Sequence, residues 1–184
     1  DPIIGNCGFL VNNNSLNPTN ITENCGISTV TNNYNGTATL NGSTFPVGLT
    51  TVVWTVVDIN GNSQTCSYVV NVQDNEAPVT SNCPSNIIVN AEAGKCTANV
   101  TYDLPRFDDN CGGINQLGTL VNGLASGSDF PKGVTTVTYR YFDAAGNGPA
   151  TCTFTVTVND NQEPVISCPP NVIVNNNGTN LNFA

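Results

Sequence analysis

Apolar and polar side chains alternate with a period of two residues along several segments of this chain. In residues 151–158 threonine occupies every other position, and the positions between read Cys, Phe, Val and Val. Residues 66–72 repeat that apolar face as Cys, Tyr, Val and Val, and residues 52–56 and 137–141 alternate likewise. A period of two with one polar face is typical of half-buried antiparallel strands, and no segment shows a sustained helical period of 3.6.

A series of landmarks occurs twice, at a spacing of about 86 residues. This repeat predicts one module at residues 1–76, which lacks its first strand, and a complete module at 77–162. Residues 163–184 then form the first strand and the start of a third module, so we expect the chain to come from a longer array. The matching pairs are Cys25-Gly26 with Cys111-Gly112, Phe45-Pro46 with Phe130-Pro131, Cys66 with Cys152, Asp74-Asn75 with Asp160-Asn161, and Cys83-Pro84 with Cys168-Pro169.

The strand pattern predicts an all-β fold of tandem immunoglobulin-like β-sandwich modules with disulfides. About seven short strands fit into each repeat, and Gly61-Asn62 and Gly146-Asn147 mark the turns of the last hairpins. The aromatic residues Trp54, Tyr139 and Tyr141 share the strand register of neighbouring valines, so we expect them in the core rather than on a sugar-binding surface.

Charge and composition exclude several classes of function. The chain has only four basic residues against 13 acidic ones, for a net charge of −9. Nucleic-acid binding and docking on anionic membranes both need clustered Lys and Arg, and no apolar run is long enough to span a bilayer. Histidine is absent, and no arrangement of catalytic residues is evident. We therefore predict that the protein is not an enzyme and requires no cofactor.

Eight cysteines in 184 residues, an even number, indicate a disulfide framework formed in an oxidising compartment. Zinc binding is disfavoured because no Cys-x-x-Cys pair and no histidine occur. These observations predict an extracellular or cell-surface protein.

The repeated landmarks resemble the HYR (hyalin repeat) module, an immunoglobulin-like family of extracellular adhesive proteins. The resemblance implies a cell-surface or matrix protein, and the family includes long bacterial surface adhesins and filaments. The abundance of Asn and Thr with little Lys favours a bacterial surface array. The residues that carry the resemblance are Cys83-Pro84, residues 109–112 (DNCG), 130–133 (FPKG), 143–147 (DAAGN) and 152–158 (CTFTVTV).

Strand order in a sandwich predicts a Cys111–Cys152 disulfide, and by repeat Cys25–Cys66. The other four cysteines leave two alternatives open. One is a local Cys83–Cys96 pair; the other consists of two pairs across module boundaries. The second alternative accounts for all eight cysteines and would stiffen the array into a rod. Its pairs are Cys7–Cys83 and Cys96–Cys168.

The linkers between modules are rich in Asp, Asn and Glu, and the second resembles the calcium-binding linker of cadherins. Carboxylates and Asn carbonyls are ligands that calcium prefers, although turns use the same residues for their backbone conformation. A further acidic group, Asp108, Asp109 and Asp143, is expected at the hairpin end of the second module. The candidate calcium ligands of the linkers are Asp74, Asn75, Glu76, Asp160, Asn161 and Glu163.

Two hypotheses for function follow. The first is a structural stalk or filament repeat of an extracellular adhesin, whose partners are the neighbouring repeats. The second is a calcium-assisted module that binds a surface carbohydrate or protein. As a third possibility, residues 172–180 would complete the sandwich of a neighbouring subunit by strand addition.

Overall fold

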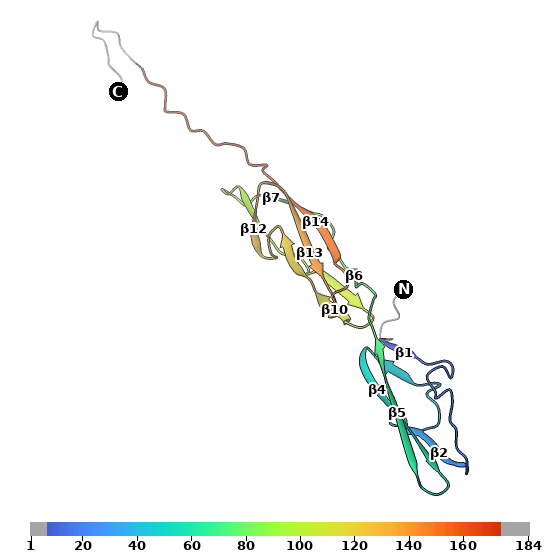
Figure 1. Ribbon diagram of the computed structural model, residues 1–184. Coiled ribbons are helices and arrows are strands. Elements are labelled where there is room, and N and C mark those ends of the chain that lie inside the picture. The colour runs from blue at the N-terminus through green and yellow to red at the C-terminus, as the bar shows by residue number, and fades with distance from the viewer. Residues whose placement is uncertain (1–6, 174–184) are drawn as a thin grey trace.

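The computed structural model describes residues 7–173, and every described element is a β-strand. Two sandwich modules lie end to end, and a segment without regular structure extends beyond the second module (Figure 1). The all-β fold of tandem sandwich modules predicted from the alternating pattern is confirmed. No helix long and apolar enough to cross a membrane occurs within this range.

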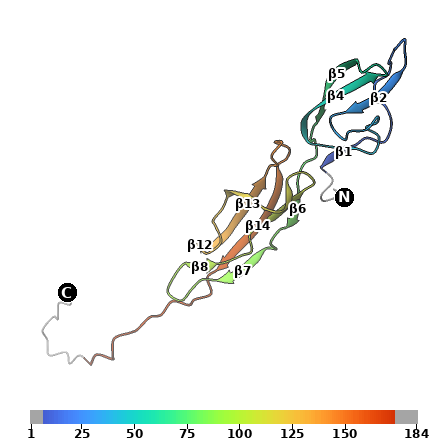
Figure 2. The same cartoon turned by 90° about the horizontal axis from the view of Figure 1, so that it is seen from below.

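The N-terminal module contains five strands in two sheets. A three-stranded sheet has the order β2-β4-β5 (Figure 2), and β1 pairs with β3 in a second, two-stranded sheet. The register pairs Trp54 with Cys66, so β4 and β5 form the long hairpin predicted around Gly61. The strands are β1 (Gly8–Leu10), β2 (Ile27–Asn32), β3 (Thr44–Pro46), β4 (Gly48–Asp58) and β5 (Ser63–Val72).

The C-terminal module contains nine strands. Its main sheet has the order β11-β13-β14-β7, in which β7 runs parallel to β14; the smaller sheets are β10-β9-β6 and β12-β8. The module has two strands more than the expected seven. One of the two arises because the first edge is divided at Cys83-Pro84 into β6, which joins one sheet, and β7, which joins the other. The strands are β6 (Val79–Asn82), β7 (Ile87–Asn90), β8 (Thr97–Val100), β9 (Arg106–Asp109), β10 (Gly113–Leu117), β11 (Thr119–Asn122), β12 (Ser128–Pro131), β13 (Gly133–Tyr141) and β14 (Ala150–Asn159).

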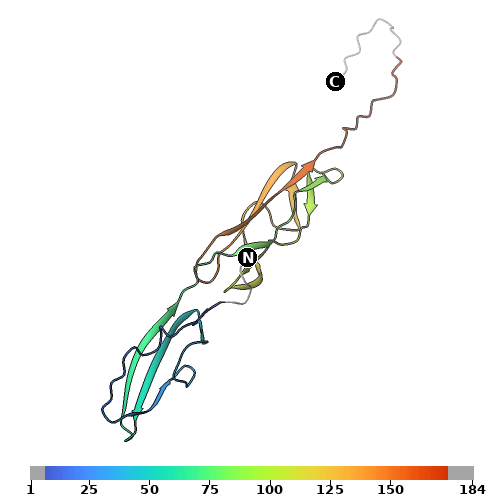
Figure 3. The same cartoon turned by 90° about the vertical axis from the view of Figure 1, so that its right-hand side faces the viewer.

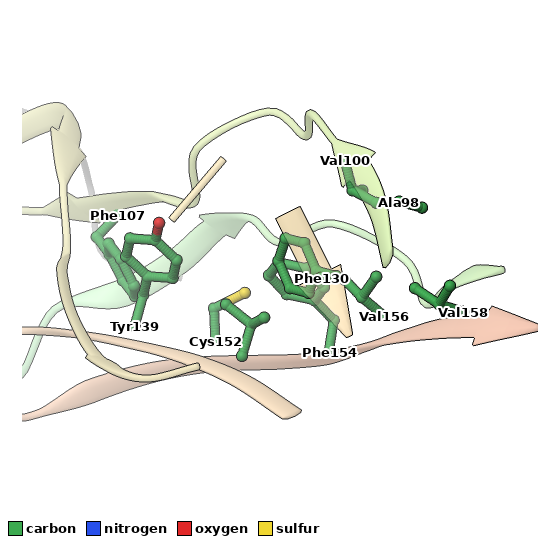
Figure 4. Close-up of a cluster of buried hydrophobic side chains, with 10 residues drawn as sticks. Ala98, Val100, Phe107, Phe130, Tyr139, Cys152, Phe154, Val156 and Val158 are labelled. Atoms are coloured by element: carbon green, nitrogen blue, oxygen red, sulfur yellow. The ribbon is translucent and has the colours of Figure 1, made fainter. Parts of the chain in front are cut away.

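Each module encloses its own hydrophobic core. In the C-terminal module the apolar face of β14 is fully buried, while the threonine face remains half-buried or exposed. Phe130 and Phe154 pack at the centre of this core (Figure 4). The smaller N-terminal core consists of Val11, Leu40, Phe45, Val52 and Trp54. Trp54 and Tyr139 therefore lie in the two cores, as their strand register predicts, while Tyr141 is partly buried beside the second.

The predicted third module begins with a segment that forms no strand. Residues 163–173 are exposed and run away from both modules (Figure 3). Of the strand expected at 172–180, residues 174–180 lie outside the described residues.

Candidate functional site: the junction between the modules

A disulfide joins the two modules directly. Cys7 lies just before β1 of the N-terminal module, and Cys111 lies in the turn between β9 and β10 of the C-terminal module. The two sulfurs are bonded, with a Cα–Cα distance of 4.7 Å and a separation of 104 residues along the chain. The linker that follows β5 crosses the same junction, so two covalent connections hold the modules together there.

Three carboxylates from separate segments meet beside this disulfide. Asp74 comes from the linker, Asp109 from the end of β9, and Asp143 from the turn after β13. One oxygen from each lies within 4.8 Å of the others. Asp109 and Asp143 are buried, with exposed fractions of 1% and 7%. Three negative charges in this space repel one another unless a cation or protons compensate them.

Backbone groups hold Asp109 in place but leave one of its oxygens without a partner. Its Oδ1 accepts hydrogen bonds from the backbone N–H of Cys111 at 2.8 Å and of Gly112 at 2.6 Å. Among residues 7–173, its buried Oδ2 has no hydrogen-bond partner, and neither does the buried Oδ1 of Asn110. A buried carboxylate oxygen without a partner is costly, which makes it a candidate ligand atom.

Asn147 fixes the second carboxylate and ties it to the linker. Its backbone N–H donates to Asp143 Oδ1 at 2.7 Å, and its Nδ2 donates to Asp143 Oδ2 at 2.8 Å. The same Nδ2 donates to the backbone carbonyl of Asp74 at 3.0 Å. Burial raises the pKa of Asp143, but the hydrogen bonds from Asn147 and nearby backbone N–H groups outweigh it, and the net pKa is lowered. Asp143 therefore remains charged at neutral pH.

The charge of the cluster is not neutralised by a basic side chain in the part of the chain that the structure describes. The ion pairs there join Lys95 to Glu92 and Lys132 to Asp160, both away from the cluster. Burial, followed by the negative charges of Asp109 and Asp143, raises the pKa of Tyr141.

The cluster consists of carboxylate oxygens, a ligand type that calcium prefers. Calcium binds six to eight oxygen atoms, and carboxylates with carbonyl oxygens supply them in flexible geometry. Asp74, Asp109 and Asp143 would provide the charged ligands. The cation would supply positive charge that relieves the repulsion between segments of the linker and the C-terminal module.

The structure assembles the predicted ligands only in part. Asp74 joins Asp109 and Asp143, so the linker and hairpin groups, expected as separate sites, form one cluster. Asn75 lines the adjoining groove, and Glu76 accepts a hydrogen bond from Asn110 Nδ2 at 3.0 Å. Asp108 is not part of this cluster, and its Oδ1 accepts a hydrogen bond from Ser81 Oγ at 2.9 Å. Sequence reasoning separated the groups because they come from segments about 35 residues apart.

The second linker forms no such cluster within the described residues. Asp160 lies 3.2 Å from Lys132 Nζ, and Asn161 Nδ2 donates to Asn90 Oδ1 at 2.9 Å. Glu163 is exposed. The expectation that these residues bind calcium remains a prediction.

The predicted cysteine pairing is wrong. Cys111 bonds to Cys7 and not to Cys152, because the turn after β9 lies at the junction, beside the N-terminal module. Cys152 points into the core and bonds to Cys83, at a Cα–Cα distance of 5.6 Å. The crossing from β6 to β7 brings Cys83 there, since β7 lies beside β14.

The remaining cysteines do not form the expected bonds. Cys25, Cys66, Cys96 and Cys168 are exposed thiols in the described structure. The pairs Cys25–Cys66, Cys7–Cys83, Cys96–Cys168 and Cys83–Cys96 are therefore all absent. One disulfide within a module and one across a junction do occur, but between other partners.

Comparison with known proteins decides the family. The HYR domain model matches residues 8–72 and again residues 73–158. This chain belongs to the HYR domain family. Its two HYR modules together with the two disulfides indicate an extracellular repeat protein.

The chain is also similar to several named proteins. The chain is 36% identical over 131 residues to hyalin of Strongylocentrotus purpuratus, covering 69% of this chain and 11% of that protein. It is 36% identical over 135 residues to hyalin of Lytechinus variegatus, covering 72% and 25%. It is 31% identical over 114 residues to the sushi, von Willebrand factor type A, EGF and pentraxin domain-containing protein 1 of Rattus norvegicus, covering 62% and 3%. The chain thus spans a quarter or less of the length of these relatives.

Proposed function

We propose that these HYR modules form a load-bearing stalk in an extracellular adhesion protein, and that the junction keeps neighbouring modules aligned. The observation that carries this proposal is the coincidence of two restraints at one junction. The Cys7–Cys111 disulfide and the Asp74–Asp109–Asp143 cluster both lie there. A linker held by a second covalent bond and a bridging cation has far less orientational freedom than a single flexible chain.

Calcium has a defined part in this proposal. Without it, the three carboxylates repel one another and favour movement of the linker away from β9. With it, the linker is bound to the C-terminal module. The aromatic side chains Trp54, Phe107 and Phe154 are buried in the cores, so they are not available as a ligand platform for the alternative of a binding module.

The alignment of the modules is measurable by NMR residual dipolar couplings of the full chain with its four free thiols alkylated. With calcium present, we expect the two modules to share one alignment tensor. In Cys7→Ala/Cys111→Ala with a chelator, we expect two different tensors. Alkylated Cys25→Ala/Cys96→Ala is the matched control and should behave as wild type. Two different tensors in the calcium-bound wild-type chain would overturn the stalk mechanism.

A further inference from the structure

One short turn of the C-terminal module carries three links across the junction. This junction turn, residues 109–112, begins at the end of β9. Its carboxylate joins the acidic cluster, its asparagine donates a hydrogen bond of 3.0 Å to the linker, and its cysteine forms the disulfide to the N-terminal module. The linked pairs are Asp109 with Asp74, Asn110 with Glu76, and Cys111 with Cys7.

The cysteine and the carboxylate of the junction turn are held to each other. Asp109 Oδ1 accepts the backbone N–H of Cys111 at 2.8 Å and that of Gly112 at 2.6 Å. Hydrogen bonds to an ionised acceptor are about twice as strong as those between neutral groups. Gly112 also packs closely, since a Cβ added to it would lie 3.3 Å from the same Oδ1. A displacement of the Cys111 backbone therefore displaces the carboxylate of Asp109.

The second oxygen of Asp109 indicates a ligand that the described chain does not supply. The residue is 1% exposed, and within residues 7–173 its Oδ2 has no hydrogen-bond partner. Buried polar atoms almost always have a partner, and a cation is a partner that a carboxylate oxygen accepts. The backbone donors of the junction turn thus hold one oxygen and leave the other free to bind a cation.

The disulfide and the linker restrict the same movement of the two modules. Cys7 precedes β1 and Asp74 follows β5, and both line one groove of about 470 Å³ together with Asn110 and Cys111. When the disulfide is closed, Asp74 is held near Asp109 before any cation binds. When the disulfide is open, the linker is the remaining covalent connection, and a cation must also offset the entropy lost in ordering it.

We propose that the Cys7–Cys111 disulfide positions the ligands of the calcium site and is coupled to that site through the junction turn. The closed disulfide strengthens calcium binding because it holds Asp109 and Asp74 at their places. By thermodynamic linkage, bound calcium makes the disulfide harder to reduce by the same factor. This inference rests on the proposed function, which supplies the calcium ion, and adds that the redox state of the junction controls the affinity for it.

The redox step is a two-electron exchange with a dithiol such as dithiothreitol. The S–S bond between Cys7 and Cys111 breaks, and the two sulfurs take up two electrons and two protons. The two thiols of the reductant supply them and close into its cyclic disulfide. Calcium takes no part in the electron transfer; it changes the equilibrium constant because it binds the oxidised chain more tightly than the reduced one.

Isothermal titration calorimetry tests the coupling from the side of the cation. The full chain is used with its exposed thiols alkylated, and wild type is compared with Cys7→Ser/Cys111→Ser. We expect the variant to bind calcium at least about fivefold more weakly. Far-UV circular dichroism checks that both chains retain their strands. Equal affinities in two folded chains would overturn the inference.

The redox equilibrium tests the coupling from the side of the disulfide and needs no cysteine variant. Wild type is equilibrated in mixtures of reduced and oxidised dithiothreitol, and the thiols are then trapped and quantified by peptide mapping. Saturating calcium should raise the ratio of oxidised to reduced Cys7–Cys111 by the factor found in the titration. Sodium chloride at equal ionic strength is the control for general screening and should leave the ratio unchanged. Equal ratios in the two salts would contradict the coupling, because a disulfide that only stiffens the junction does not respond to calcium.

A matched pair of acidic variants localises the effect. Asp143→Asn removes a ligand and leaves the junction turn and both cysteines intact, so the calcium-dependent change in the ratio should disappear. Asp58→Asn is the control, because Asn62 holds Asp58 at 2.8 Å and 2.8 Å as Asn147 holds Asp143 at 2.7 Å and 2.8 Å. In this control the change should persist. Its loss in both variants, or in neither, would overturn the assignment to the cluster.

Failure of this inference and failure of the proposed function give different results. If wild type binds calcium but the redox ratio does not respond, the coupling is wrong and the stalk with its cation stands. If wild type binds no calcium in the titration, the proposed function loses its cation and the coupling is excluded with it.

Discussion

The two modules carry the same strand pattern but bury it differently. In β14 the side chains of Cys152, Phe154, Val156 and Val158 are all buried, with exposed fractions of 2% or less. At the equivalent positions of β5, Tyr68, Val70 and Val72 are half-buried and Cys66 is exposed. The two modules differ because β6 and β7 cover the edge of the C-terminal module, whereas no described strand occupies the equivalent place in the N-terminal module. Alternation therefore selects which face turns inward, whereas the neighbouring strand determines how completely that face is buried.

The disulfide of the complete module should produce the largest difference between the two. Replacing Cys83 and Cys152 together by Ala should destabilise the C-terminal module by about 4 kcal/mol, because the bond closes a loop with a sequence separation of 69. Urea unfolding followed by far-UV circular dichroism measures this loss. The Trp54 fluorescence transition of the N-terminal module is the internal control and should not move. A shift of both transitions would contradict the assignment of this bond to one module.

A matched pair of valines compares the packing directly. Val156→Ala removes a fully buried side chain and should cost about 2 kcal/mol of unfolding free energy, whereas Val70→Ala should cost less than about 1 kcal/mol. Urea unfolding of the two variants gives both numbers. Equal costs in the free chain would mean that the third strand does not control burial.

Calcium should distinguish the acidic turns of the two modules. Asp143→Asn removes a ligand of the cluster and should weaken calcium binding at least about tenfold, or about 1.4 kcal/mol. The equivalent Asp58→Asn lies in the module without an assembled cluster, and binding to the monomeric chain should remain unchanged. Isothermal titration calorimetry on alkylated protein measures both. Unaltered binding in Asp143→Asn would remove the cluster as the calcium site.

The pH dependence of stability should show the smallest effect. The pKa of Asp143 is lowered in the folded state from its ordinary value of 3.8, so the unfolded chain binds more protons near that pH. The stabilisation is present above the unfolded pKa and is lost as the pH falls through the folded value. In calcium-free buffer, the unfolding free energy should decline less steeply below about pH 4 in Asp143→Asn than in wild type. Identical slopes would indicate that Asp143 has the same pKa in both states.

Local patterns were sufficient for the strands and the repeat. Residues 151–158 fall within β14, and residues 66–72 fall within β5, because a period of two needs only near neighbours to be recognised. The sequence predicted the residues of the acidic cluster as two separate groups, one in the linker and one at the hairpin end of the second module. Its members Asp74 and Asp143 come close because the linker passes the turn after β13, and no short segment of sequence contains both.

The sequence by itself determined the all-β modules, their tandem repetition, their family and the inward face of each main strand, since these depend on residue order over a few positions or on the spacing of repeats. Tertiary structure alone decided which thiols bond and which carboxylates meet. Cys7 and Cys111 are separated by 104 residues, and Cys83 and Cys152 by 69, so their pairing depends on where the linker crosses and which sheet each edge strand joins.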